Sequence, residues 1–151
     1  MSSGKKLFET FFVGNNGTQY YIKPITFSDE ENDKLKFDMT FRYKNVIKDS
    51  ATLNMSFIDS EIIKSIDSLK ISNDSISLLF TKVNLMFVER HKKVFNSRFS
   101  TRSHLAPIKW LFKNKNWSIY LYRNNIVDKY MATKSTKRKI TKLKFEIFEL
   151  F

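Results

Sequence analysis

The sequence predicts an α+β fold that is mainly antiparallel β-sheet, with about six to eight strands and one or two short helices packed against it. Two observations favour this class. Apolar and polar residues alternate over 35–43 and again over 53–57, as they do in strands that bury one face. Two short stretches, 60–66 and 103–113, begin with a residue that can cap a helix and continue with apolar residues at helical spacing.

A hairpin is expected near the start of the chain. Two apolar runs, 7–13 and 18–27, flank residues 14–17 (Gly-Asn-Asn-Gly), and glycine and asparagine tolerate the positive φ angles of a tight turn. Pro24 lies in the second run and cannot donate a ladder hydrogen bond, so it indicates an edge strand or a bulge. The acidic stretch 28–33 follows as a solvated connector.

The middle of the chain is expected to continue as strands. Residues 76–88 place apolar side chains at positions that suit either a helix or strands, and their β-branched content favours strands. The runs 85–89 and 94–101 then form a hairpin around 91–93. A further strand is expected at 117–122, where apolar and polar residues alternate.

Three expectations concern the last third of the chain. The helix over 103–113 begins at Ser103, which can cap it, and has Pro107 in its first turn. The basic segment around 124–139 is expected to be a loop or a loosely held helix. Residues 143–147 alternate in polarity, which predicts a closing strand.

The composition is that of one folded domain covering residues 1–151. Its 15 Phe, 6 Tyr and 2 Trp supply large apolar side chains for a core. A chain of this length buries roughly two-thirds of the surface that it exposes when unfolded. The absence of cysteine excludes disulfides, thiolate metal sites and thiol catalysis. No signal-peptide pattern and no apolar run of spanning length is found, so a soluble, cytoplasmic protein is expected.

Positive charge is distributed very unevenly along the chain. Residues 76–151 contain 17 Lys and Arg against 4 Asp and Glu, whereas residues 1–75 contain 10 against 11. From Arg90 to Lys144, 16 cations accompany one acid, Asp128. Such a field concentrates anions around one part of a molecule, which points to a polyanionic or acidic partner.

The candidate anion-binding residues are cations of this basic part of the chain. Arg98 and Arg102 share one face of their strand, and forked guanidinium donors beside hydroxyl groups suit phosphate. The run 134–139 is typical of segments that bind nucleic acid, acidic proteins or anionic lipid. For both runs the alternative is a solvated surface without a ligand. The expected contacts are Lys92, Lys93, Arg98, Arg102, Lys113, Lys115, Arg123, Lys137, Arg138 and Lys139.

Aromatic residues among these cations are candidates for stacking on nucleic-acid bases. Tyr120 and Tyr122 are expected on the polar face of their strand and are therefore the predicted stacking residues. Trp110 and Trp117 fall in apolar periodic stretches and are expected in the core.

The sequence predicts no catalytic residue, metal ligand or cofactor. His91 and His104 are the two histidines, and the cations around them repel a metal ion. The aromatic signature of RNA-recognition sheets, zinc fingers and phosphate-binding glycine loops are all absent.

The expected function is that of a non-enzymatic binding module whose basic half contacts nucleic acid or another polyanion. The first alternative is a protein-interaction or inhibitory module that docks on an acidic partner, where charge mainly accelerates encounter. The second is a small enzyme acting on an anionic substrate, with Arg98 and Arg102 clamping the anion and a histidine transferring protons. The identity of the partner and the oligomeric state do not follow from the sequence.

Overall fold

The computed structural model describes residues 6–43 and 50–150 of the chain. This part contains one antiparallel sheet of ten strands and two α-helices. The strands are β1 (Phe8–Phe12), β2 (Thr18–Ser28), β3 (Lys34–Tyr43), β4 (Ser50–Asp59), β5 (Ser68–Ser72), β6 (Ser77–Phe80), β7 (Asn84–His91), β8 (Val94–His104), β9 (Ser118–Arg123) and β10 (Ile126–Ala132). The helices are α1 (Leu105–Phe112) and α2 (Lys134–Glu146). The mainly antiparallel α+β class is confirmed, and the number of strands exceeds the expected six to eight.

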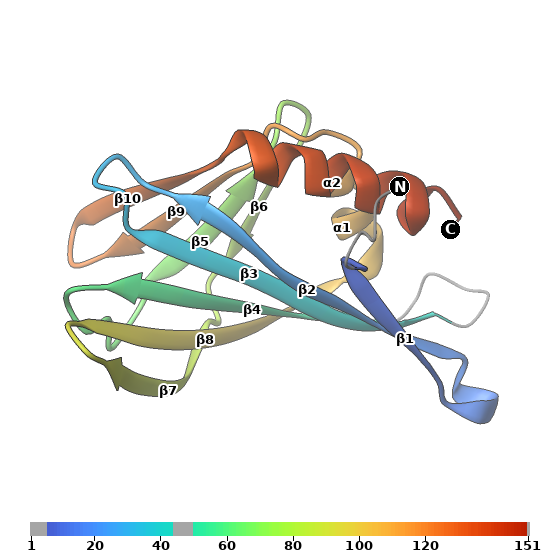
Figure 1. Ribbon diagram of the computed structural model, residues 1–151, viewed down its shortest axis with the longest axis horizontal. Helices are drawn as coiled ribbons and strands as arrows, with labels where there is room; N and C mark the ends of the chain where they lie inside the picture. Colours follow the sequence, from blue (N-terminus) through green and yellow to red (C-terminus); the bar gives the residue numbers. More distant parts are fainter. Residues whose placement is uncertain (1–5, 44–49, 151) are drawn as a thin grey trace.

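The sheet is curled into a half-barrel, and both helices lie on its concave side (Figure 1). The strand order is β6-β5-β9-β10-β2-β3-β4-β8-β7, with β1 also paired to β2. The joint between β10 and β2 is short, since only Met131 and Ala132 pair there, with Ser28 and Phe27. Helix α2 packs against both of these strands and covers the joint from inside.

The hairpin and the bulge expected near the start of the chain are both confirmed. Strands β1 and β2 pair from Phe8 to Phe12, across a short 3-10 turn at Gly14–Asn16. In the ladder between β2 and β3, Ile22 and Ile25 pair with Met39 and Phe37. Two residues of β2, one of them Pro24, therefore face one residue of β3, which is a bulge that spares proline a ladder hydrogen bond.

The core fills the concave side of the sheet. Inward residues alternate along each central strand, and aromatic rings from several strands meet around Trp117, which is 1% exposed. The Trp117 ring lies 4.8 Å from Phe112 of α1 and 5.6 Å from Phe37 of β3, measured between ring centroids. Its indole N–H donates to the Leu111 carbonyl at 2.9 Å, so the core burial expected for Trp117 is confirmed with its polar atom satisfied.

Trp110, in contrast, was expected in the core and is 53% exposed. It lies on the outer side of α1, because Ile108, Leu111 and Phe112 already occupy the buried face of this eight-residue helix. The Lys113 ammonium lies 3.7 Å from the centroid of the Trp110 ring, which places a cation over an accessible aromatic face.

Helix α1 confirms the helix expected at 103–113, including Pro107 in its first turn. The expected cap is wrong: the N-cap is His104, without a side-chain hydrogen bond, and the Ser103 hydroxyl donates to the His104 carbonyl. Residues 60–66 form no helix. Their backbone is instead tied to the sheet, because the buried N–H of Ile63 donates to the Ser97 hydroxyl at 3.1 Å.

The end of the chain differs from expectation in two places. Residues 126–132, within the segment 124–139 expected to be a loop or a loosely held helix, form β10, whereas residues 134–139 begin α2, in keeping with the helical alternative. Residues 143–147, expected to be a strand, lie at the end of α2 and its C-cap. The buried residues Thr136, Ile140 and Leu143 follow helical spacing, so one face of a helix, and not of a strand, is covered by the rest of the protein. Within the described ranges, no helix has the length and apolar character needed to span a membrane.

Candidate functional site

The ten predicted anion contacts do not gather on one side of the molecule. Five groups result from the fold. They are Lys92 and Lys93 at the β7–β8 turn, Arg98 and Arg102 on the outer face of β8, Lys113 and Lys115 after α1, Arg123 at the end of β9, and Lys137, Arg138 and Lys139 on α2. The outer face of β8 and the concave side that holds α2 are opposite faces of the sheet (Figure 1).

Two of the predicted contacts are already neutralised inside the protein. The Arg98 guanidinium forms an ion pair with Asp38 at 2.9 Å and also donates to the Ser56 hydroxyl. The Arg123 guanidinium pairs with Asp128 at 3.3 Å. Each of these arginines has a structural partner in the folded chain, so neither supplies a free charge for an external anion.

Helix α2 is built so that its cations face outward. Thr133 caps its start, because the side-chain oxygen accepts the Thr136 N–H at 3.2 Å. The Thr136 hydroxyl donates to the Thr26 carbonyl of β2, which anchors the first turn to the sheet. Ile140 and Leu143 continue the buried side of the helix. The opposite side is therefore held towards solvent along its whole length.

The outward side carries three exposed cations in one line. Lys134, Arg138 and Lys142 are spaced four residues apart, a rise of about 6 Å from each to the next. Phe145 lies on the same line and is 57% exposed, with the Lys144 ammonium 5.4 Å from its ring centroid. We call these four residues, Lys134, Arg138, Lys142 and Phe145, the α2 ridge. Lys137, Lys139 and Lys144 flank the ridge and are partly buried.

The charges of the α2 ridge oppose the stability of the helix. No acid lies in the first turn, where the positive end of the helix dipole favours a negative side chain. Lys134 and Arg138, like Arg138 and Lys142, are four residues apart, a spacing at which like charges destabilise a helix by about 0.2–0.5 kcal/mol a pair. At the C-terminal end of the helix, the Glu146 carboxylate lies 3.8 Å from the Lys142 ammonium and offsets part of this positive charge. Cations placed against helix stability make this line of side chains a candidate site.

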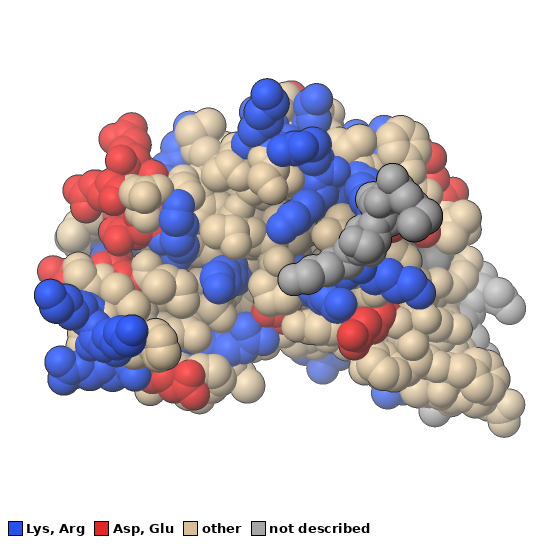
Figure 2. Space-filling model, viewed as in Figure 1, with Lys and Arg blue, Asp and Glu red and all other residues tan. Residues whose placement is uncertain are grey.

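Figure 2 shows the separation of charge over one face of the molecule. Lys and Arg side chains line the top of the view, where α2 lies in Figure 1, and a second basic group lies at the lower left, over the β7–β8 turn. Asp and Glu side chains gather at the upper left, over the β2–β3 turn. An approaching polyanion is therefore attracted to α2 and repelled from the β2–β3 end of the half-barrel.

The acidic end of the half-barrel, around the β2–β3 turn, is not among the sites that the sequence predicts, where residues 28–33 are expected only to be a solvated connector. It surrounds a hollow of about 680 Å³ whose lining includes Asp29, Asp33, Asp59 and Asp128. Burial raises the pKa of the Asp33 carboxyl, and the neighbouring carboxylates of Asp59 and Asp29 raise it further. Within residues 6–43 and 50–150, no three histidine or acidic side chains are arranged to hold a metal ion.

Tyr120 and Tyr122 occupy the outer face of β9 as expected, with Ile119 and Leu121 buried on the other side. The Tyr120 ring has the Lys70 ammonium 4.5 Å from its centroid and the Lys129 ammonium at 5.5 Å. Lys70 and Lys129 are the residues paired with Tyr120 on β5 and β10. The ring is thus flanked by cations on both neighbouring strands, and both of these lysines are absent from the predicted set.

His91 and His104 lie near opposite ends of β8, since His91 pairs with Val94 at its first residue and His104 is its last. Both are exposed. Nothing in this geometry brings the two imidazoles to one substrate, so the arrangement offers no support for shared acid–base chemistry.

No protein-family model, no curated protein sequence and no solved structure matches this chain. The geometry described above therefore stands as the sole basis for a functional assignment.

Proposed function

We propose that this protein binds single-stranded nucleic acid along the α2 ridge. The observation that carries the proposal is that Lys134, Arg138 and Lys142 form an outward line of cations at a cost to the helix that bears them. Phosphates bound along this line relieve the repulsion between its cations. A polyanion is therefore the partner that offsets this cost.

Phe145 favours nucleic acid over other polyanions. Its ring is exposed within the line of cations, where an apolar side chain gains nothing from contact with water. Bases stack on accessible aromatic rings, and each such contact contributes about 1–3 kcal/mol. A duplex keeps its bases stacked internally, so an aromatic residue on the ridge suits a single strand.

The experiment compares two triple variants with the same change of charge. The first is Lys134→Gln/Arg138→Gln/Lys142→Gln on the α2 ridge. The control is Lys82→Gln/Lys92→Gln/Lys93→Gln, in the β6–β7 connection and the β7–β8 turn, where the side chains are exposed. Affinity for a labelled single-stranded oligonucleotide is measured by fluorescence anisotropy over a range of salt concentrations.

For the wild type, three phosphate contacts predict a log–log slope of binding constant against salt of about −2 on single strands. The ridge variant is expected to lose most of this slope and the control to keep it. Equal losses in the two variants would show that the charge acts diffusely and would contradict the proposal. Phe145→Ala is expected to weaken oligonucleotide binding at least tenfold while leaving heparin binding unchanged, because heparin has charge but no bases.

The edge strand β7 favours a second candidate, docking of another protein. Among the described residues no strand pairs with its outer edge, and Leu85, Met86 and Phe87 are exposed along it. Arg90 and Lys92 follow at its end, so the strand runs from an apolar to a basic stretch. An extended acidic segment of a partner matches this edge by adding a strand to the sheet.

This candidate is tested with two labelled peptides of alternating valine and charged residues, one with glutamate and one with lysine. The glutamate peptide is expected to bind, and Leu85→Gln/Phe87→Gln, which removes the apolar contacts without changing the charge, is expected to abolish binding. Equal binding of the lysine peptide, or binding that survives the double substitution, would remove β7 as the docking edge.

A further inference from the structure

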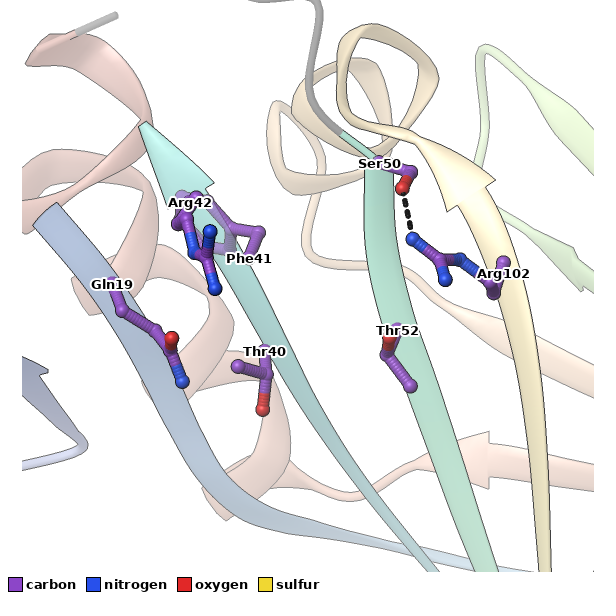
Figure 3. A pocket seen from close by; sticks show the side chains of 7 residues that line it. All are labelled: Gln19, Thr40, Phe41, Arg42, Ser50, Thr52 and Arg102. Atoms are coloured by element: carbon purple, nitrogen blue, oxygen red, sulfur yellow. Dashed lines mark hydrogen bonds between the residues drawn. The ribbon is translucent and has the colours of Figure 1, made fainter. Parts of the chain in front are cut away.

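A hollow on the outer face of the sheet lies on the side of the strands opposite the helices (Figure 3). Its volume is about 310 Å³, at the lower end of the range for small-molecule sites. Arg42 of β3 and Arg102 of β8 stand on opposite sides of it, with Thr40 and Thr52 between them (Figure 3). The lining residues are Gln19, Thr40, Phe41, Arg42, Ser50, Thr52 and Arg102.

The pairing of the strands explains why these side chains meet. Thr40 pairs with Thr52, and Thr52 pairs with Arg102, so one cross-strand row supplies the floor and one wall. Gln19 pairs with Arg42 in the adjacent row and supplies the opposite wall. Four strands thus bring together two guanidinium groups and several hydroxyl and amide groups. The strands themselves are rigid supports, which is favourable for a binding site.

The charge of this hollow is unbalanced, unlike that around Arg98 and Arg123. Arg98 and Arg123 each have an aspartate partner. Among residues 6–43 and 50–150, neither Arg42 nor Arg102 has an ion pair, and none of the described residues that line the hollow is acidic. Ser50 accepts a hydrogen bond from one Arg102 nitrogen at 2.5 Å, which orients this guanidinium and leaves its other donors available.

We propose that this hollow binds the phosphoryl group of a small phosphomonoester. Such a group carries about −1.5 to −2 charges at pH 7 and offers three acceptor oxygens. It therefore matches two guanidinium groups, with acceptor capacity left for the Thr40 and Thr52 hydroxyls. A carboxylate or a phosphodiester carries one charge and leaves one arginine uncompensated. The site is thus distinct from the α2 ridge, which faces the diester phosphates of a chain, and does not depend on it.

The test is a titration with inorganic phosphate at constant ionic strength, followed by the chemical shifts of backbone amides and of the arginine side chains. Saturable shifts are expected at Arg42, Thr52 and Arg102, without shifts along α2. Dimethyl phosphate, which has one charge, is expected to bind at least tenfold more weakly. Shifts confined to α2, or equal binding of the diester, would overturn the proposal without needing any variant.

Substitutions add a second arm to this test. Arg42→Gln and Arg102→Gln are each expected to weaken phosphate binding at least tenfold, and Arg102→Lys to weaken it less, because lysine keeps the charge and loses the fork. Lys36→Gln, at an exposed position on the outer face of β3 that does not line the hollow, is the control and is expected to leave phosphate binding unchanged. Unchanged binding in both pocket variants would overturn the assignment. Glycerol phosphate and a nucleoside 5′-monophosphate then distinguish a lipid headgroup from a nucleotide as the source of the group.

Discussion

The guanidinium of Arg98 donates to the two carboxylate oxygens of Asp38 at 2.9 and 3.1 Å, although the residues are 60 positions apart and β4 lies between their strands. Two residues of β4 complete the network: the Asn54 amide donates to Asp38, and the Ser56 hydroxyl accepts from Arg98. The Asp38 side chain is 2% exposed on a face of the sheet that otherwise contacts water. The pair thus holds three strands together on the convex face.

Removing the cation of this pair is expected to destabilise the protein more than neutralising the acid. Arg98→Gln leaves a carboxylate buried without its counter-charge and is expected to cost about 3 kcal/mol of unfolding free energy. Asp38→Asn leaves a guanidinium that is 25% exposed and can be hydrated, so its cost is smaller. Urea denaturation of both variants and of the double variant measures the difference. Strictly additive costs would show that the two side chains act independently.

Neutralising Lys134 and Arg138 of α2 is expected to stabilise the protein. Lys134→Gln/Arg138→Gln removes both like-charge pairs of the ridge and takes one cation out of the first turn, where the helix dipole opposes it. The unfolding free energy is expected to rise by about 0.5–1 kcal/mol at low salt. The gain should largely disappear in 1 M salt, because the repulsion is then screened. A loss of stability at low salt would contradict the view that these cations act against folding.

The cap of α2 is expected to matter for both the fold and the ridge. Thr133→Ala removes the acceptor of the Thr136 N–H and is expected to cost about 1 kcal/mol of unfolding free energy. Thr133→Ser keeps the hydroxyl and serves as the control, with nearly wild-type stability. Thermal unfolding measures both. If the alanine variant were as stable as the serine variant, the first turn would owe its stability to the Thr136–Thr26 contact alone.

The acidic end of the half-barrel is expected to give a pH-dependent stability. Because the pKa of Asp33 is raised by burial and by nearby carboxylates, the folded protein binds this proton more tightly than the unfolded chain does. Its contribution is present at pH 3 and is lost as the pH rises from about 4, the unfolded pKa, through the raised folded value. Asp33→Asn is therefore expected to increase the melting temperature at pH 7 more than at pH 3.

Glu30→Gln is the control for this measurement, since Glu30 lies exposed in the same turn. It is expected to change the melting temperature by a similar small amount at both pH values. An increase for Asp33→Asn that is the same at pH 3 and pH 7 would mean that the ionisation of Asp33 does not oppose folding.

The sequence by itself determined the elements whose pattern is local. The alternation over 35–43, the hairpin around residues 14–17, the bulge at Pro24 and the helix at 103–113 are all present, because each depends on neighbours within about ten residues. Side-chain alternation also placed Tyr120 on the outer face of its strand correctly.

The tertiary structure alone decided where the charges lie and which of them have partners. Arg98 meets Asp38 only because β4 pairs with both β3 and β8, and Arg42 and Arg102 line one hollow for the same reason. Such meetings depend on strand order, and alternation within single strands carries no information about it. Helix α2 was expected only in part, as one of two alternatives for 124–139, and its end was expected to be a strand, because its polar composition hides a narrow buried face. Contact with the sheet through Ile140, rather than local propensity, stabilises that helix.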